Sequence, residues 1–238
     1  MTRERPDPRL IVALDVDSLE SMQALAAQLD PSLCRVKVGK ELFTRCGPRA
    51  LETLARDGFE VFLDLKFHDI PNTVARACAA AADLGVWMIN VHALGGARML
   101  EAAVATLAPR ASRPLLVAVT ILTSLSDQDV AQLGLPGTAA QNVVRLAGLA
   151  DDCGLDGVVC SPLEISLVHE ATRPGFRLVT PGIRPAGAGA DDQRRTLTPA
   201  AAIRAGADYL VIGRPITAAD DPARQLLTIA SSLDDSDA

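Results

Sequence analysis

Short apolar runs alternate with longer Ala- and Leu-rich stretches along almost the whole chain. Several runs, such as Leu10–Leu14 and Leu115–Val119, are apolar at nearly every position. Parallel β-strands that are covered on both faces have this continuous pattern, whereas half-exposed strands alternate apolar and polar residues. The pattern predicts strands at Leu10–Val16, Arg35–Val38, Glu60–Lys66, Met88–His92, Leu115–Thr120, Gly157–Ser161, Arg177–Thr180 and Tyr209–Ile212.

The stretches between these runs carry signals for the start and end of helices. A helix is expected over Thr73–Leu84, closed by Gly85, because glycine tolerates the left-handed conformation that often ends a helix. Asp17 and Glu20 have the spacing of a capping box, which predicts that a helix over Ser21–Leu29 begins there.

Eight strand–helix units in succession favour one closed (β/α)8 barrel, which needs roughly 250 residues. The chain has 238 residues, so we expect a single barrel domain over 1–238, with frayed ends at 1–8 and 234–238. An open doubly wound sheet is the alternative. No GxGxxG motif follows the first predicted strand, which disfavours that alternative.

Charge and cysteine content narrow the class of protein. The formal net charge is −6 and no basic stripe is visible, so we expect no nucleic-acid polymer as a partner. The five cysteines form no CxxC pair and are expected to be free thiols in a reducing compartment. Neither a signal-peptide core nor an apolar run of roughly 18 residues occurs, so we expect no membrane association and a cytoplasmic location.

Lysine is rare in this chain. Of 23 basic residues only three are lysines, Lys37, Lys40 and Lys66, and all three fall within thirty positions. Arginine does not give up its proton in a protein, whereas a lysine ammonium is compact and can act as an acid. The lysines therefore indicate a segment where the protein needs a proton donor. The alternative is that their clustering arose by chance.

The segment Phe62–Pro71 contains the densest charge. Asp64 and Lys66 are two apart on a predicted strand and face the same side, and Asp69 follows in the loop. Active sites of these barrels lie at the carboxyl ends of strands, where Lys37 on the preceding strand can join them. A structural ion-pair network is one alternative. A Mg²⁺ site on the two aspartates is another, but an ammonium competes for the same oxygens, so we predict no metal site.

The ends of the last two predicted strands have the residues for a phosphate site. Barrels often bind phosphate with these loops, where glycine lets backbone N–H groups approach an anion and arginine makes charge-assisted bonds. A Gly- and Ala-rich stretch at 186–192, followed by Gln193, is interpreted as a lid, with a solvated loop as the alternative. The candidates for the phosphate are Arg184, Gly213 and Arg214.

Over nearly its whole length the chain resembles the orotidine 5′-monophosphate (OMP) decarboxylases. The Asp-x-Lys-x-x-Asp spacing alone is shared with related sugar-phosphate enzymes, but its combination with the Pro-Gly-Ile-Arg-Pro and Ile-Gly-Arg-Pro-Ile-Thr segments is specific. The matching stretches are Ile11–Asp15, Val36–Phe43, Asp64–Thr73, Val119–Ser124, Gly157–Ser161, Val179–Pro185 and Val211–Thr217.

The resemblance implies a role for each charged residue. Lys66 is the general acid that protonates C6 after CO₂ leaves, and Asp64 lies against the substrate carboxylate. Lys37 holds Asp64 and the ribose hydroxyls. Asp69 completes the network in the neighbouring subunit's site, which implies a homodimer.

The resemblance also assigns substrate contacts. Asp15 binds ribose, Thr73 contacts ribose from the partner chain, Thr123 lines the pyrimidine site, and Gln193 reaches the phosphate. Asp15, Thr73 and Thr123 also fit local roles as helix caps or hydroxyls bonded to their own backbone.

The implied reaction is decarboxylation of OMP to UMP, the last step of de novo UMP synthesis, without a cofactor. No pyridoxal or thiamine site is evident to accept electrons, so the protein must stabilise the carbanion-like intermediate by electrostatics. A metal-dependent hexulose-phosphate synthase on the same barrel is one alternative. A nucleotide-phosphate sensor without catalysis is another, although sensing needs no proton donor.

Overall fold

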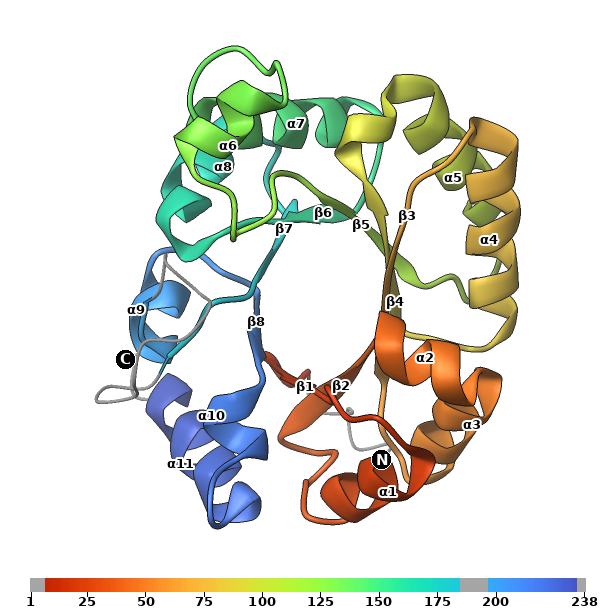
Figure 1. The fold of residues 1–238 in the computed structure, drawn as a ribbon, viewed down its shortest axis with the longest axis vertical. Helices are drawn as coiled ribbons and strands as arrows, with labels where there is room; N and C mark the ends of the chain where they lie inside the picture. The colour runs from red at the N-terminus through yellow and green to blue at the C-terminus, as the bar shows by residue number, and fades with distance from the viewer. Residues whose placement is uncertain (1–6, 185–196, 235–238) are drawn as a thin grey trace.

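Eight parallel strands close into a barrel, seen end-on in Figure 1 as a ring surrounded by helices. The computed structural model describes residues 7–184 and 197–234, and the remainder lies outside the described residues. Each strand pairs with the next, and β1 pairs with β8, so the predicted (β/α)8 barrel is confirmed. The strands are β1 (Leu10–Ala13), β2 (Cys34–Gly39), β3 (Val61–Phe67), β4 (Met88–His92), β5 (Leu115–Val119), β6 (Gly157–Val159), β7 (Arg177–Thr180) and β8 (Tyr209–Ile212).

The helices form an outer layer around the strands (Figure 1). No helix within the described ranges combines the length and the apolar character that crossing a bilayer requires. The helices are α1 (Leu19–Ala26), α2 (Lys40–Cys46), α3 (Pro48–Arg56), α4 (Pro71–Asp83), α5 (Ala97–Leu107), α6 (Asp127–Gln132), α7 (Ala139–Asp152), α8 (Ile165–Ala171), α9 (Pro199–Arg204), α10 (Arg214–Thr217) and α11 (Pro222–Asp234), with 3₁₀ turns η1 (Ala93–Gly95) and η2 (Pro162–Glu164).

The observed strands lie within or close to the predicted runs, and the differences concern their ends. The first run was expected to continue to Val16, but β1 ends at Ala13, and β6 ends two residues before the predicted Ser161. At these ends the chain leaves the ladder to form the loops above the barrel. An apolar run therefore locates a strand well but does not show where its pairing stops.

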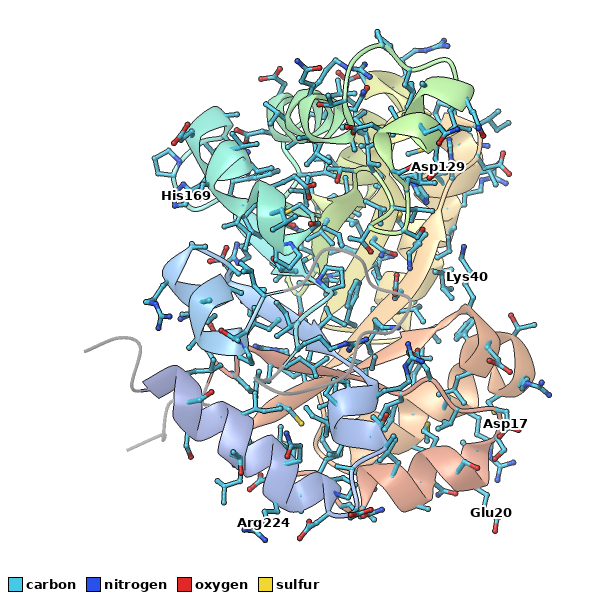
Figure 2. All side chains as sticks on the ribbon, turned by 60° about the vertical axis from the view of Figure 1, so that its left-hand side comes forward. Asp17, Glu20, Lys40, Asp129, His169 and Arg224 are labelled. Carbon is cyan, nitrogen blue, oxygen red and sulfur yellow. The ribbon has the colours of Figure 1, made fainter. Side chains whose placement is uncertain are left out.

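The predicted N-cap of the first helix is wrong by one residue, and the helix expected over Ser21–Leu29 lies at Leu19–Ala26. Ser18, not Asp17, is the N-cap of α1, because its hydroxyl oxygen accepts the backbone N–H of Ser21 at 3.1 Å. Asp17 and Glu20 lie on the outer surface of the molecule in Figure 2 and form no capping box. Two adjacent residues could both cap a helix, and only the backbone conformation decides between them.

The interior of the barrel is apolar through most of its depth. One cluster of buried side chains from β1, β3, β4, β5, β7 and β8 fills it, and a larger cluster packs between the strands and the helices. A packed interior means that polar side chains at the carboxyl ends rest on a rigid floor. The interior cluster consists of Ile11, Phe62, Met88, Val117, Val179 and Tyr209.

Arg35 packs under this cluster at the amino-terminal end of β2. Its guanidinium carbon lies 3.9 Å from the centre of the Trp87 ring, and its nitrogens pair with Glu60 and Asp7. The Arg35 side chain also donates to the carbonyl oxygen of Pro8. These contacts hold the segment that enters β1 against the base of the barrel.

Candidate active site

A cavity of about 350 Å³ opens at the carboxyl ends of the strands. Its floor and one wall are apolar, with Phe62, Val159 and Val211 among the lining residues. Charged residues and glycines also line the cavity. The sequence-predicted residues that line this one cavity are Asp15, Lys37, Asp64, Lys66, Thr123, Arg184, Gly213 and Arg214.

Asp64 is the centre of a linear charge network on one side of the cavity. Nζ of Lys66 lies 2.5 Å from its Oδ1 atom, and Nζ of Lys37 lies 3.3 Å from its Oδ2 atom. Lys37 continues the chain to Asp15, whose Oδ1 atom is 3.2 Å away. The side chains of Asp64 and Lys37 are both 11% exposed, whereas that of Lys66 is 26% exposed. The Lys66 ammonium is therefore the better placed of the two to meet a ligand.

The network keeps Asp64 and Lys37 ionised although both are buried. Burial by itself raises the pKa of Asp64, but the ammonium groups of Lys37 and Lys66 and two hydrogen bonds outweigh it and lower that pKa below its usual value. Burial by itself lowers the pKa of Lys37, and the carboxylates of Asp64 and Asp15 reverse this effect and raise it. A carboxylate and an ammonium held in this way form a fixed pattern of charge at neutral pH.

Lys66 has an unusual backbone conformation. Its φ angle is +54°, the only positive φ of a non-glycine residue in the described ranges. The pairing of β3 with β4 shifts register at this point, since Leu63 faces Ile89 but Phe67 faces Val91. A left-handed lysine costs roughly 1–2 kcal/mol, and such strain persists only where the surroundings impose it. The bulge turns the end of β3 so that the lysine side chain enters the cavity.

Asn90 also lines the cavity, although the sequence by itself assigned no role to this polar residue near the end of its predicted strand. Its side-chain nitrogen donates to Oδ1 of Asp64 at 2.6 Å, and its side-chain oxygen accepts the backbone N–H of Lys66 at 2.8 Å. The signal was present in the sequence, because Asn90 is an amide at an inward-facing position of the predicted strand Met88–His92. A polar residue that faces a barrel interior needs partners, and here both belong to the charge network.

The carboxyl ends of β7 and β8 hold the predicted phosphate-binding residues, and β8 lies next to β1. Gly182 is buried and has a φ angle of +81°, and Gly213 precedes the short helix α10. Arg184 and Arg214 line the same space. The backbone N–H of Arg184 donates to the carbonyl oxygen of Leu197 at 2.9 Å. The predicted lid at 186–192 and Gln193 lie outside the described residues.

Asp69 and Thr73 do not line the cavity of their own chain. Asp69 is exposed in the loop after β3, where its carboxylate accepts the backbone N–H of Ile70. Thr73 is exposed in the first turn of α4. The structure thus gathers most of the predicted residues around one cavity and leaves these two at the surface beside it.

Two histidines lie next to the charge network. The ring centres of His68 and His92 are 5.4 Å apart, and Nδ1 of His92 is buried without a hydrogen-bond partner in the described structure. Burial lowers the pKa of His92 to about 4, with His68, Lys40 and Lys66 adding to the effect and Asp64 opposing it. His92 is thus neutral at physiological pH.

The third lysine does not belong to the site. Lys40 is exposed at the start of α2, does not line the cavity, and lies at the edge of the molecule in Figure 2. Two of the three lysines, Lys37 and Lys66, therefore line the cavity. In the described residues no group of three or more His, Cys, Asp or Glu side chains is arranged to hold a metal ion.

Comparison with known proteins agrees with this geometry. The model of the "Orotidine 5′-phosphate decarboxylase / HUMPS family" matches residues 8–229. The chain belongs to this family. The matched range includes every described side chain of the cavity wall, so the charge network and the phosphate-side residues all lie in the shared part of the family fold.

Individual members of the family are similar along almost their whole length. The orotidine 5′-phosphate decarboxylase of Halorhodospira halophila is 61% identical over 226 residues, which cover 95% of this chain and 96% of that protein. The protein of the same name from Saccharophagus degradans is 57% identical, with 96% of each chain covered. A crystal structure of orotidine 5′-phosphate decarboxylase from Lactobacillus acidophilus superposes with a TM-score of 0.84 at 42% identity, covering 97% of this chain and 99% of that one.

Proposed function

We propose that this protein is a carboxy-lyase that decarboxylates OMP to UMP, with Lys66 as the proton donor to C6. The observation that carries the proposal is the Lys66 ammonium, which lies 2.5 Å from Asp64 and lines a cavity large enough for a nucleotide. Membership of the OMP decarboxylase family supports the substrate.

The chemistry follows from the charges at the cavity wall. When CO₂ leaves, the bond between C6 and the carboxyl carbon breaks and its electron pair stays on C6. The ring cannot delocalise this in-plane pair, so a fixed ammonium beside it lowers the barrier by electrostatic stabilisation. Lys66 then transfers a proton to C6, which gives UMP, and the amine regains a proton from solvent. These steps use groups of the chain and a proton from solvent, and they need no cofactor.

Asp64 has two roles in this proposal. It holds the Lys66 ammonium in position, and its charge opposes the substrate carboxylate until that carboxylate departs as CO₂. Repulsion of this kind raises the energy of the bound substrate and is relieved in the transition state, although carbanion stabilisation by Lys66 is the larger effect we expect.

The remaining wall residues bind the rest of the nucleotide. Asp15 and Lys37 are adjacent and offer a carboxylate and an ammonium to the ribose hydroxyls. Thr123 serves the pyrimidine. Arg184, Gly213 and Arg214 line the same cavity at the ends of β7 and β8, where two arginines and a glycine suit a phosphate. The assignment of Gln193 to the phosphate rests on the family resemblance.

We further propose that the protein acts as a homodimer in the cytoplasm, with Asp69 and Thr73 reaching the partner's site. Both residues are exposed, and neither lines the cavity of its own chain. Ile70, between them, is 67% exposed, and Leu94 after β4 is 42% exposed. Exposed apolar side chains beside a polar cluster are typical of an interface.

The reaction is tested by following the absorbance of OMP with the purified protein in the presence of EDTA. We expect full turnover. Lys66→Ala should lose at least ~4 kcal/mol of transition-state stabilisation, about 10³-fold in rate, while it still binds UMP. Lys40→Ala is the matched control, because Lys40 is exposed and lies outside the cavity, and it should retain wild-type turnover. A loss of tenfold or less in Lys66→Ala defeats the assignment of the proton donor.

The same assay separates the alternatives. A metal-dependent hexulose-phosphate synthase would be inactivated by EDTA, and a nucleotide sensor would bind UMP without consuming OMP. For the dimer, Lys66→Ala and Asp69→Ala chains are unfolded together and refolded as a mixture. If Asp69 crosses to the partner, hybrid dimers contain one intact site, and about a quarter of the wild-type activity should return. No recovery would contradict the crossing.

A further inference from the structure

Asn90 stands opposite an irregular part of β3. Leu63 pairs with Ile89 and Phe67 pairs with Val91, so the three residues between them on β3 face the single residue Asn90 on β4. Asn90 is buried, with only 1% of its surface exposed. A bulge of this size removes hydrogen bonds from the ladder, and the groups that lose them need other partners.

The side-chain amide of Asn90 provides a partner for one of these backbone groups and also bonds to a side chain of the bulge. Its oxygen accepts the backbone N–H of Lys66 at 2.8 Å, and its nitrogen donates to Oδ1 of Asp64 at 2.6 Å. A backbone N–H only donates and an ionised carboxylate only accepts, so these two bonds fix which end of the amide is which. The same Oδ1 atom accepts the Lys66 ammonium at 2.5 Å.

The Asn90 amide therefore holds Lys66 through two hydrogen bonds, one direct and one through Asp64. It bonds directly to the backbone of Lys66, at the one non-glycine residue of the described ranges with a positive φ angle. It also bonds to the carboxylate that holds the ammonium of Lys66. A side chain whose backbone and counter-ion are both held by one rigid, buried group has little freedom to move its terminal nitrogen.

We infer that Asn90 is a positioning residue that sets the place of the Lys66 ammonium in the cavity, an inference that rests on the proposed decarboxylation. It acts through Lys66 and Asp64, and we assign it no chemical step of its own. A proton donor displaced by about 1 Å loses roughly 10²-fold in rate, so the contribution of Asn90 should appear in turnover and much less in substrate affinity.

Two substitutions separate the two bonds. Asn90→Leu has a similar size and removes both. Asn90→Asp keeps an oxygen for the backbone N–H of Lys66 but, when ionised, cannot donate to Asp64 and places a second negative charge beside it. At lower pH the new carboxyl can take a proton and donate again, so the activity of this variant should recover on acidification relative to wild type.

The matched control is Asn142→Leu. Asn142 is also a buried asparagine with several hydrogen bonds, but it lies in α7, and its side chain donates to the carbonyl oxygens of Pro136 and Thr138. Loss of a buried amide should destabilise both leucine variants to a similar extent. Only the Asn90 variants should lose turnover.

The experiment measures kcat and KM for OMP, the pH profile and the affinity for UMP in all three variants. We expect kcat of Asn90→Leu to fall about 10²-fold, with KM and UMP affinity changed less than about threefold. If Asn90→Leu does not fold, Asn90→Asp decides through its kcat and pH profile. Wild-type kcat in the variants, or a loss that is confined to KM, overturns the positioning role and leaves the proposed function intact. Absence of OMP turnover in the wild-type protein rejects the proposed function instead.

Discussion

Lys37 and Asp64 lie on neighbouring strands, and Nζ of Lys37 is 3.3 Å from Oδ2 of Asp64. The other oxygen of Asp64 accepts the ammonium of Lys66, so one buried carboxylate lies between two positive charges. Removal of this carboxylate leaves both ammonium groups without their shared partner, and a buried charge that loses its partner is costly.

We therefore expect Asp64→Asn to lower kcat/KM for OMP at least about 10²-fold. Asparagine has the same shape, so the loss reports on charge and not on packing. Asp83→Asn is the control, because Asp83 pairs with Arg110 at the surface and plays no part in the cavity. Steady-state kinetics of the two variants checks this prediction. If kcat/KM of Asp64→Asn equals that of Asp83→Asn, the charge of Asp64 has no part in the reaction.

Arg214→Ala should impair the reaction of OMP but not that of orotidine, which has no phosphate. If Arg214 contacts the phosphate, the charge-assisted bond contributes about 1.5–3 kcal/mol, or roughly 10–100-fold in kcat/KM. Orotidine should also lose turnover in the wild-type protein, because binding energy from the phosphate is no longer available to the reacting centre. Arg224→Ala on the surface of α11, labelled in Figure 2, is the control. Equal effects of Arg214→Ala on both substrates contradict the phosphate contact.

The lowered pKa of His92 predicts that the free energy of unfolding depends on pH. Burial lowers its pKa in the folded protein to about 4, whereas the unfolded chain has the ordinary value near 6.5. Between these values the unfolded state binds more protons, so the free energy of unfolding should fall as the pH is lowered from 6.5 to 4. His92→Gln should flatten this part of the curve, which urea unfolding at several pH values measures. An unchanged slope in the variant argues that His92 is already charged in the folded state.

Gly157 and Gly148 should respond oppositely to alanine. A Cβ atom at Gly157 would lie 2.2 Å from the carbonyl oxygen of Arg177 on the neighbouring strand, where the backbone cannot move without opening the barrel. We expect Gly157→Ala to destabilise the protein by at least about 2 kcal/mol. Gly148 lies within α7 with open space around it, so its replacement should stabilise by about 0.5–1 kcal/mol. Urea midpoints compare the two, and the reverse order would contradict the close approach of β6 and β7.

Arg35 should contribute to stability and not to catalysis. The residue is only 5% exposed, and its guanidinium stacks on Trp87 and pairs with Glu60 at the end of the barrel opposite the cavity. Lysine cannot form this planar, multiply bonded arrangement, so Arg35→Lys should destabilise the protein by about 2 kcal/mol and leave kcat unchanged. Arg45→Lys, in an exposed pair with Glu41, should change stability by less than about 0.5 kcal/mol. A fall in kcat would mean that the base of the barrel is coupled to the cavity.

Asp64 and Lys66 show how far a local pattern predicts this site. Their spacing of two predicts a shared face, and both residues do line the cavity. Yet β3 is not a regular strand there, because four steps from Leu63 to Phe67 match only two steps from Ile89 to Val91. The bulge adds an even number of residues to β3, so the side chains before and after it still alternate between the same two faces. The spacing therefore predicted that the two side chains share a face, although it did not predict the bulged backbone on which they do so.

The sequence by itself determined the eight strands, their order and the charged residues at their ends, because apolar runs and motif spacing are properties of neighbouring residues. Only the tertiary structure decided that Lys66 adopts a left-handed backbone, that Asn90 completes the network and that Ser18 caps α1. It also decided that Asp69 and Thr73 are exposed and do not line the cavity of their own chain. Each of these features depends on contacts between segments far apart in the chain or on the exact path of the backbone, and periodicity along one segment carries no information about either.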